Sequence, residues 1–81
     1  MWFVYILQSK VKNKFYIGCT NDVERRLTEH NAGYNLSTRF FRPYELIHIE
    51  KYSDQTEAYS REKQIKSYKG GNAFKKLIRR K

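Results

Sequence analysis

Residues 2–8 constrain the possible folds of this chain more than any other segment, because apolar side chains occupy both alternating faces of the run. A strand that faces water on one side alternates apolar and polar residues, whereas a strand covered on both sides does not. The run is also rich in aromatic and β-branched residues, which favour the extended conformation. We therefore expect residues 2–8 to form a buried central strand.

Two further strands are predicted beside it. Residues 14–20 follow after a short turn, which predicts a hairpin, and Gly18 inside this strand favours a bulge or a close backbone approach. Residues 44–52 predict a third strand, and we expect it at an edge of the sheet because polar residues share one of its faces.

Three segments carry helical signals. Asn21, followed three residues later by Glu24, resembles a capping box that opens a first helix. A second helix begins at residue 53 or 54 and runs to about residue 68, and a short basic helix follows over 73–80 with Asn72 as its cap. The order β-β-α-β-α-α, with helices flanking a three-stranded antiparallel sheet, predicts an α+β fold in a single domain that spans all 81 residues.

Basic charge is concentrated in the last quarter of the chain. Residues 61–81 contain nine Lys or Arg and one acidic residue, whereas residues 1–60 contain eight basic and seven acidic residues, for a net charge of +9. Folding does not require such a distribution, and its electric field attracts polyanions, so we expect nucleic acid as a partner. The alternative is a solvated tail whose only role is solubility.

Membrane and secretory roles are not indicated. No run approaches the roughly 18 apolar residues that a membrane span needs, and the predicted helices lack the broad apolar face that interfacial binding requires. The apolar N-terminus has no basic region ahead of it, as a signal peptide would. Cys19 is the only cysteine, which leaves neither an internal disulfide nor a zinc cluster and fits the reducing cytoplasm.

Glu62 is the clearest polar residue at a position where packing favours an apolar one. At 100° per residue, Ala58, Ile65 and Lys69 lie in the same narrow sector of the second helix, so the carboxylate should point at the sheet. The competing interpretation is an i, i+4 ion pair with Lys66, worth about 0.3–0.5 kcal/mol, with the side chain in solvent.

The first helix repeats this pattern. His30 lies on its apolar face, one turn after Leu27. Arg26 lies at the edge of the same face, whereas Arg25 points away and is expected to pair with Glu29. A histidine near a helix C-terminus is often only a dipole partner or a satisfied core residue, and that alternative stays open.

Tyr5 and Tyr16 stand opposite each other if the hairpin pairs symmetrically about residues 10 and 11. Tyrosines are common in strands for packing reasons alone. A buried phenol nevertheless needs a hydrogen-bond partner, so a pair of inward tyrosines is a candidate for chemistry.

These positions together resemble the GIY-YIG nuclease superfamily. Residues 3–5 (Phe-Val-Tyr) and 16–18 (Tyr-Ile-Gly) resemble its paired tripeptides, although the first keeps only the tyrosine. Residues 16–31 resemble the strand-and-helix core, and residues 56–66 resemble the helix that carries the metal-binding glutamate. The match is closest to short, stand-alone bacterial members. Relatives include the incision domain of bacterial excision repair and homing endonucleases, which implies DNA repair or recombination.

The resemblance implies a metal-dependent endonuclease that hydrolyses phosphodiester bonds in DNA or RNA. It assigns Glu62 to a single Mg²⁺ or Mn²⁺ ion, which one hard carboxylate with retained waters suits. It assigns Arg26 to the phosphate, which a guanidinium can bind through two donors. Tyr16 becomes the base or the group that positions the attacking water, with Tyr5 as its support. His30 relays a proton or orients the phosphate.

Nucleic-acid binding is expected from two groups of cations. Arg39 and Arg42 flank Phe40 and Phe41, a combination typical of single-strand grooves, although the phenylalanines alternatively fill the core. The second group follows the two C-terminal helices: Lys63, Lys66, Lys69, Lys75, Lys76, Arg79, Arg80 and Lys81. No sequence-reading helix is evident, so we expect nucleic-acid structure, or a protein partner that supplies targeting, to determine where the chain acts.

Two other functions stay open. A non-catalytic nucleic-acid-binding module of the same fold would bind without cleaving, and metal-dependent nicking distinguishes the two. A partner-docking protein would present its basic C-terminus to an acidic protein or RNA surface. Steep salt dependence of binding would indicate phosphate contacts instead of hydrophobic docking.

Overall fold

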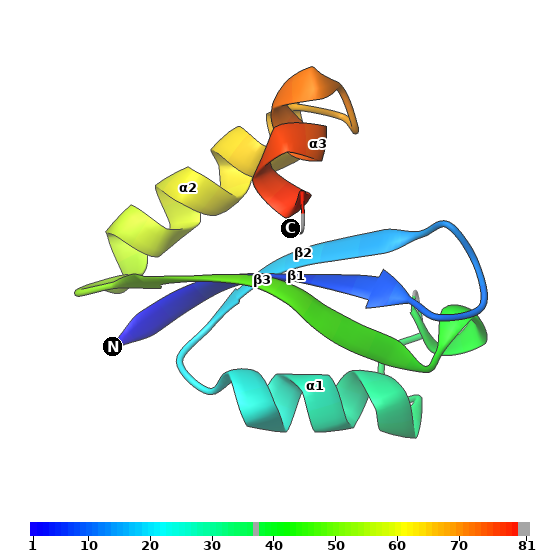
Figure 1. The fold of residues 1–81 in the computed structure, drawn as a ribbon. Helices are drawn as coiled ribbons and strands as arrows, with labels where there is room; N and C mark the ends of the chain where they lie inside the picture. The colour runs from blue at the N-terminus through cyan, green and yellow to red at the C-terminus, as the bar shows by residue number, and fades with distance from the viewer. Residues whose placement is uncertain (37, 80–81) are drawn as a thin grey trace.

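The fold is known from a computed structural model that describes residues 1–36 and 38–79. Its strands β1, β2 and β3 form one antiparallel sheet in the order β2-β1-β3, and three helices and a short 3-10 turn complete it. The bounds are β1 Trp2–Ser9, β2 Phe15–Thr20, α1 Val23–Ala32, η1 Arg39–Phe41, β3 Tyr44–Tyr52, α2 Gln55–Ser67 and α3 Asn72–Ile78. The predicted α+β fold and element order are confirmed. α1 covers one face of the sheet, and α2 and α3 cover the other (Figure 1).

β1 is the central strand that residues 2–8 predicted. Val4 and Ile6 are buried on the face that α2 covers, with Ala58, Ile65 and Phe74 packed near them. Tyr5 and Leu7 are buried on the opposite face. Each such side chain contributes about 1.5–3 kcal/mol through burial, so β1 holds both layers of helices to the sheet.

The predicted register of the hairpin is wrong by two residues. Tyr5 pairs with Gly18, and Tyr16 pairs with Leu7. The cause is a longer turn: the Ser9 backbone N–H donates to the Lys14 carbonyl, and the Ser9 hydroxyl accepts from two further backbone N–H groups within the turn. A shift of two residues keeps each side chain on its face, so both tyrosines still lie on the α1 face.

Two predicted helix caps are also corrected. Asp22, and not Asn21, caps α1, and its carboxylate accepts the Arg25 backbone N–H at 3.0 Å. Because the Thr20 hydroxyl accepts the Asp22 backbone N–H, the chain enters the helix one residue later than predicted. Gly71, and not Asn72, precedes α3 as its cap.

α2 begins as predicted, with Asp54 as its cap and the Glu57 backbone N–H donating to the Asp54 carboxylate. β3 lies at an edge of the sheet, as its polar face predicted. In the described part of the chain, every helix is too short or too polar to traverse a lipid bilayer.

Candidate active site

Tyr5 and Gly18 form the base of the site. Tyr5 is 1 % exposed, and its ring lies over Gly18 of the neighbouring strand β2. A Cβ atom at position 18 would approach the Tyr5 hydroxyl more closely than van der Waals contact permits, so glycine is needed here for space. The close approach predicted at Gly18 is therefore made by a side chain. The irregularity of the sheet lies elsewhere, between Ile6 and Leu7.

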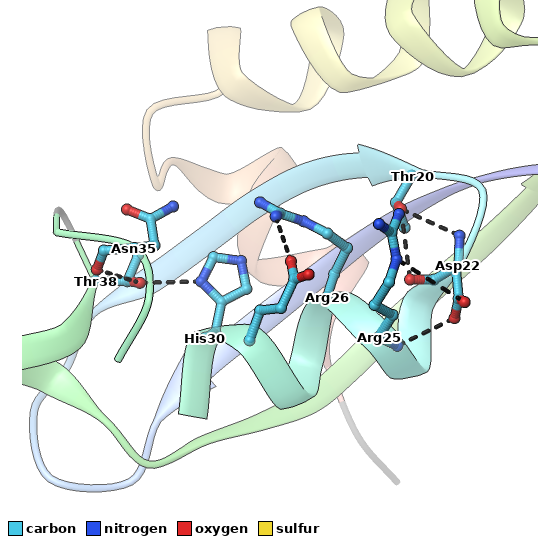
Figure 2. A network of polar contacts seen from close by, with 8 residues as sticks. Thr20, Asp22, Arg25, Arg26, His30, Asn35 and Thr38 are labelled. Atoms are coloured by element: carbon cyan, nitrogen blue, oxygen red, sulfur yellow. Dashed lines mark hydrogen bonds and ion pairs between the residues drawn. The ribbon is translucent and has the colours of Figure 1, made fainter. Parts of the chain in front are cut away.

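Arg26 projects from α1 on the same side as His30 (Figure 2). Its guanidinium hydrogen-bonds the Tyr5 phenol, and its Nη1 lies 2.7 Å from Glu29 Oε1. The predicted pairing of Arg25 with Glu29 is wrong, because Arg25 lies 3.9 Å from the Asp22 carboxylate instead. Asp22 caps the helix, and this brings its carboxylate beside Arg25 at an i, i+3 spacing.

His30 is buried, and Thr38 fixes its orientation. His30 Nδ1 lies 2.9 Å from Thr38 Oγ1, and the Thr38 hydroxyl donates to the Asn35 carbonyl (Figure 2). On this basis we assign the His30 proton to Nδ1, with the Thr38 oxygen as its acceptor, which leaves the lone pair of a neutral imidazole on Nε2. Nε2 has no hydrogen-bond partner among the residues that the structure describes. The Tyr16 ring packs against this histidine, with 4.4 Å between ring centroids.

The groups of the site set one another's protonation. Burial lowers the pKa of His30, and the charge of Arg26 lowers it further, so the ring is neutral near pH 7. Burial raises the pKa of Tyr5 against the opposing hydrogen bond from Arg26. The hydrogen bond with Tyr5 raises the pKa of Arg26. A neutral phenol, a neutral imidazole and a permanent cation therefore meet at this point.

The charge of Glu62 acts on the site from α2, on the opposite face of the sheet. α2 packs across β1 and β2, and the Glu62 charge adds to burial in raising the pKa of the Tyr5 hydroxyl and the Cys19 thiol. The side chain is 13 % exposed, and its Oε2 lies 2.6 Å from Lys66 Nζ. The ion pair with Lys66 forms, as the competing interpretation predicts, but the Glu62 side chain is largely buried and does not extend into solvent as that interpretation expects.

The donor set around Glu62 fits a hard, weakly held divalent ion. Among the described residues, no group of three or more His, Cys, Asp or Glu is placed to hold a metal. Structural and catalytic zinc sites need three or four protein ligands, whereas Mg²⁺ or Mn²⁺ accepts one carboxylate with water and phosphate oxygens. Glu62 therefore suits Mg²⁺ or Mn²⁺.

A pocket of about 370 Å³ opens beside this cluster. One wall comes from α1 and the other from the segment that follows it, and the lining residues are Arg26, Glu29, His30, Tyr34, Asn35 and Leu36. A phosphate or nucleotide in this pocket would lie beside Arg26 and His30, which are among its lining residues.

In residues 39–42, the aromatic and cationic segment predicted to bind nucleic acid, the two phenylalanines lie in different environments. Phe41 packs into the core on the α1 face, whereas Phe40 is 76 % exposed, with the Arg39 guanidinium 5.2 Å from its ring centroid. Arg39, Phe40 and Arg42 line a second open pocket beside the C-terminus of α1. The core interpretation is thus correct for Phe41 and wrong for Phe40.

The other predicted cations lie on the opposite side of the sheet, where α2 and α3 pack (Figure 1). All are exposed: Lys63, Lys66, Lys69, Lys75, Lys76 and Arg79. The last three line a pocket at α3 together with Asn72. Arg80 and Lys81 lie outside the described residues. The sheet therefore separates the cations into two groups.

Nothing in the sequence indicated Thr38. It lies eight residues after His30, in a segment without periodicity, and only the return of the chain across the end of α1 brings its hydroxyl to the imidazole. A local pattern carries no signal for such a contact.

Comparisons with known proteins give relatives in sequence and in structure. The family described as the GIY-YIG catalytic domain matches residues 1–75. UPF0213 protein HQ_3675A of Haloquadratum walsbyi is 45% identical over 67 residues, which are 82% of this chain and 74% of that protein. UPF0213 protein lwe0147 of Listeria welshimeri is 39% identical over 79 residues, which are 96% of this chain and 87% of that protein. The solution NMR structure of UPF0213 protein BH0048 from Bacillus halodurans is 31% identical, with 90% of each chain covered and a TM-score of 0.48.

Proposed function

This chain belongs to the GIY-YIG catalytic-domain family, a family of nucleases, and from that premise we propose that it is a metal-dependent endonuclease acting on DNA or RNA. The observation that carries the proposal is the cluster of Tyr5, Tyr16, Arg26 and His30, which three elements bring together on the α1 face, with the charge of Glu62 acting on Tyr5 from α2. Burying polar groups costs free energy, and packing alone does not require these groups to meet.

Arg26 would bind the scissile phosphate. Its guanidinium is held by Tyr5 and Glu29, and it keeps its charge at any physiological pH. Two of its donors match two phosphate oxygens and stabilise the charge that develops there in the transition state. Tyr5 would act through Arg26, as a positioning residue.

Tyr16 and His30 would handle the proton of the attacking water. During hydrolysis the water oxygen bonds to phosphorus, the bond from phosphorus to the leaving oxygen breaks, and that oxygen takes a proton from solvent. The neutral His30 ring offers an Nε2 lone pair, and the Tyr16 ring packs against it. We assign Tyr16 to orient the water and His30 Nε2 to accept the proton that the water loses.

Glu62 would hold the divalent cation. When bound, Mg²⁺ or Mn²⁺ supplies Lewis-acid stabilisation of charge on the phosphate and the leaving oxygen. Because one carboxylate binds such an ion weakly, we expect ion and nucleic acid to bind together.

Two groups of cations would bind the rest of the substrate. Arg39 and Arg42 stand beside the exposed Phe40 ring on the α1 side, and the lysines of α2 and α3 stand on the other side. Phosphate contacts position a protein on nucleic acid and carry no sequence information. We therefore expect weak sequence preference and steep salt dependence.

The test is cleavage of labelled single-stranded, duplex and flapped DNA and RNA, with Mg²⁺ or Mn²⁺ and with chelator. Glu62→Gln should remove metal-dependent cleavage and leave nucleic-acid affinity nearly unchanged. Glu24→Gln removes the same charge from an exposed position of α1 and should cleave like the parent. Parent-like cleavage by Glu62→Gln would contradict the proposal. Binding without cleavage by the parent would favour a non-catalytic module of the same fold.

A further inference from the structure

A polar cluster between β3 and α2 has no part in the proposed reaction. Glu50 accepts hydrogen bonds from Arg61 through Nε at 2.8 Å and Nη2 at 3.1 Å, one to each carboxylate oxygen. It also accepts from His48 Nε2 at 2.8 Å and from the Tyr52 hydroxyl at 2.7 Å. Such a bidentate, charge-assisted contact has one preferred geometry, so it fixes where Arg61 lies over β3.

The sheet register places this cluster level with Glu62. Val4 pairs with Cys19 on one side and with Glu50 on the other, so the three residues form one row across the sheet. α2 crosses that row: Arg61 contacts Glu50 of β3, and the charge of Glu62 acts on the Cys19 thiol of β2. Successive helix residues point about 100° apart, so Arg61 and Glu62 point in different directions from α2, Arg61 toward β3 and Glu62 toward β2.

Apolar packing by itself holds the rotation of α2 weakly. In the described part of the chain, its buried side chains are Ala58 and Ile65, and the first is only a methyl group. A rotation of about 10° would move a side-chain end, at a radius of about 5–6 Å, by about 1 Å. A displacement of this size at a catalytic group costs about a hundredfold in rate. The active site therefore needs a contact that prevents this rotation of α2.

We propose that the Glu50–Arg61 pair sets the rotation of α2 on the sheet and thereby the position of Glu62 in the active site. Both are positioning residues, since they act through Glu62 and not on the substrate. Arg61 is braced in turn, with Nη1 lying 3.0 Å from Gln64 Oε1 and 3.4 Å from the Tyr68 hydroxyl. The consequence for cleavage rests on the proposed function, but the placement of residue 62 over β2 can be measured without it.

Disulfide crosslinking measures that placement. Cys19 is the only native thiol, so the variant Glu62→Cys has two cysteines on facing elements, and oxidised glutathione should join them. Adding Arg61→Gln or Glu50→Gln should slow the crosslinking about tenfold, because residue 62 then samples other positions. Adding Arg25→Gln, which removes an exposed guanidinium from α1, should leave the rate unchanged. The double exchange Glu50→Arg with Arg61→Glu should restore most of the crosslinking rate that the single substitutions lose.

Each outcome decides the proposal. Equal crosslinking rates in all the variants would show that the pair does not position residue 62. Thermal unfolding of every variant identifies any that fails to fold. For such a variant, Arg61→Lys is the replacement, because lysine keeps the charge and loses the two-donor geometry.

The consequence for cleavage can be measured separately, through its dependence on Mg²⁺ concentration. In chains that keep Glu62, Arg61→Lys should raise the Mg²⁺ concentration for half-maximal cleavage about tenfold, with a smaller loss at saturating Mg²⁺. A purely structural role would instead lower cleavage in proportion to the unfolded fraction at every Mg²⁺ concentration. Crosslinking that depends on Arg61 in a chain without nuclease activity would keep the positioning inference and reject the proposed function.

Discussion

On the α1 face of the sheet two of the buried side chains, Tyr5 and His30, are also candidate functional ones, whereas on the α2 face the two kinds are separate. Tyr5 and His30 are each 1 % exposed, and they are held by Gly18, Arg26 and Thr38. On the α2 face the core is mainly apolar, and Glu62 lies at its margin.

The two faces therefore fix the positions of their functional groups in different ways. Where functional groups form the core, as on the α1 face, their geometry is fixed by packing, so a change there should alter stability and chemistry together. Where the functional group lies at a margin, as Glu62 does, its position depends on how the whole helix sits. Substitutions on the α2 face should therefore separate stability from activity.

The largest effect is expected at Arg26. Arg26→Lys keeps the charge but loses the planar pair of donors and the hydrogen bond to Tyr5, so cleavage should fall about 10²–10³-fold, equal to about 2.7–4 kcal/mol of transition-state stabilisation. Arg25→Lys, on the neighbouring exposed position, is the matched control and should cleave normally. Single-turnover cleavage on one substrate measures both. Equal losses in the two variants would contradict a phosphate contact specific to Arg26.

Gly18→Ala tests whether core and site are one structure on the α1 face. The added Cβ would displace the Tyr5 ring and cost about 1–3 kcal/mol of unfolding free energy, with loss of cleavage in the molecules that remain folded. Chemical unfolding and cleavage assays measure the two effects. Tyr5→Phe removes the nearest obstructing atom, so it should recover part of the stability of Gly18→Ala but not its activity. A stable, active Gly18→Ala chain would show that Tyr5 can move without consequence.

The smallest expected effect is on the pH dependence of stability, which should distinguish the two faces. The pKa of His30 is lower folded than unfolded, through burial and then Arg26. The unfolded chain therefore binds more protons below about pH 6.5, so unfolding free energy should decrease as pH falls through this range. His30→Gln should remove this slope, as measured by urea unfolding between pH 5 and 8. An unchanged slope would contradict a buried neutral imidazole.

On the α2 face the pH range in which the unfolding free energy changes is lower. Burial of Glu50 opposes its ionisation, but hydrogen bonds from Arg61, His48 and Tyr52 outweigh it and lower the pKa to about 2. The stability that the carboxylate contributes should be present above about pH 4.5 and decrease as pH falls toward 2. Glu50→Gln should thus be less stable than the parent at pH 7, and the difference should narrow at pH 3.

Prediction from sequence succeeded where the pattern was local. Residues 2–8 indicated the central strand because covering both faces of a strand leaves a continuous apolar run. The helix with Glu62 was located by spacing. The hairpin register was predicted wrongly, because it depends on the hydrogen bonds of Ser9 in the turn. A slip of two residues leaves the face of every side chain unchanged, so the apolar pattern could not detect it.

Short-range competition explains the other differences. Asn21 and Asp22 are both good helix caps, and the Thr20 hydroxyl favoured the second. Arg25 and Arg26 each had a carboxylate within one turn, and the choice of partner depended on which side of α1 met the sheet.

By itself, the sequence determined the elements, their order, the family and the set of five candidate side chains, because periodicity and short spacing are properties of the chain alone. Only the tertiary structure decided that Tyr5 crosses Gly18, that Thr38 orients His30, and that Arg61 and Glu62 meet opposite edges of one sheet row. These contacts join segments whose distance is set by strand order and by the path of the connecting loops. Such distances depend on how all the elements pack at once, and no local pattern of residues encodes them.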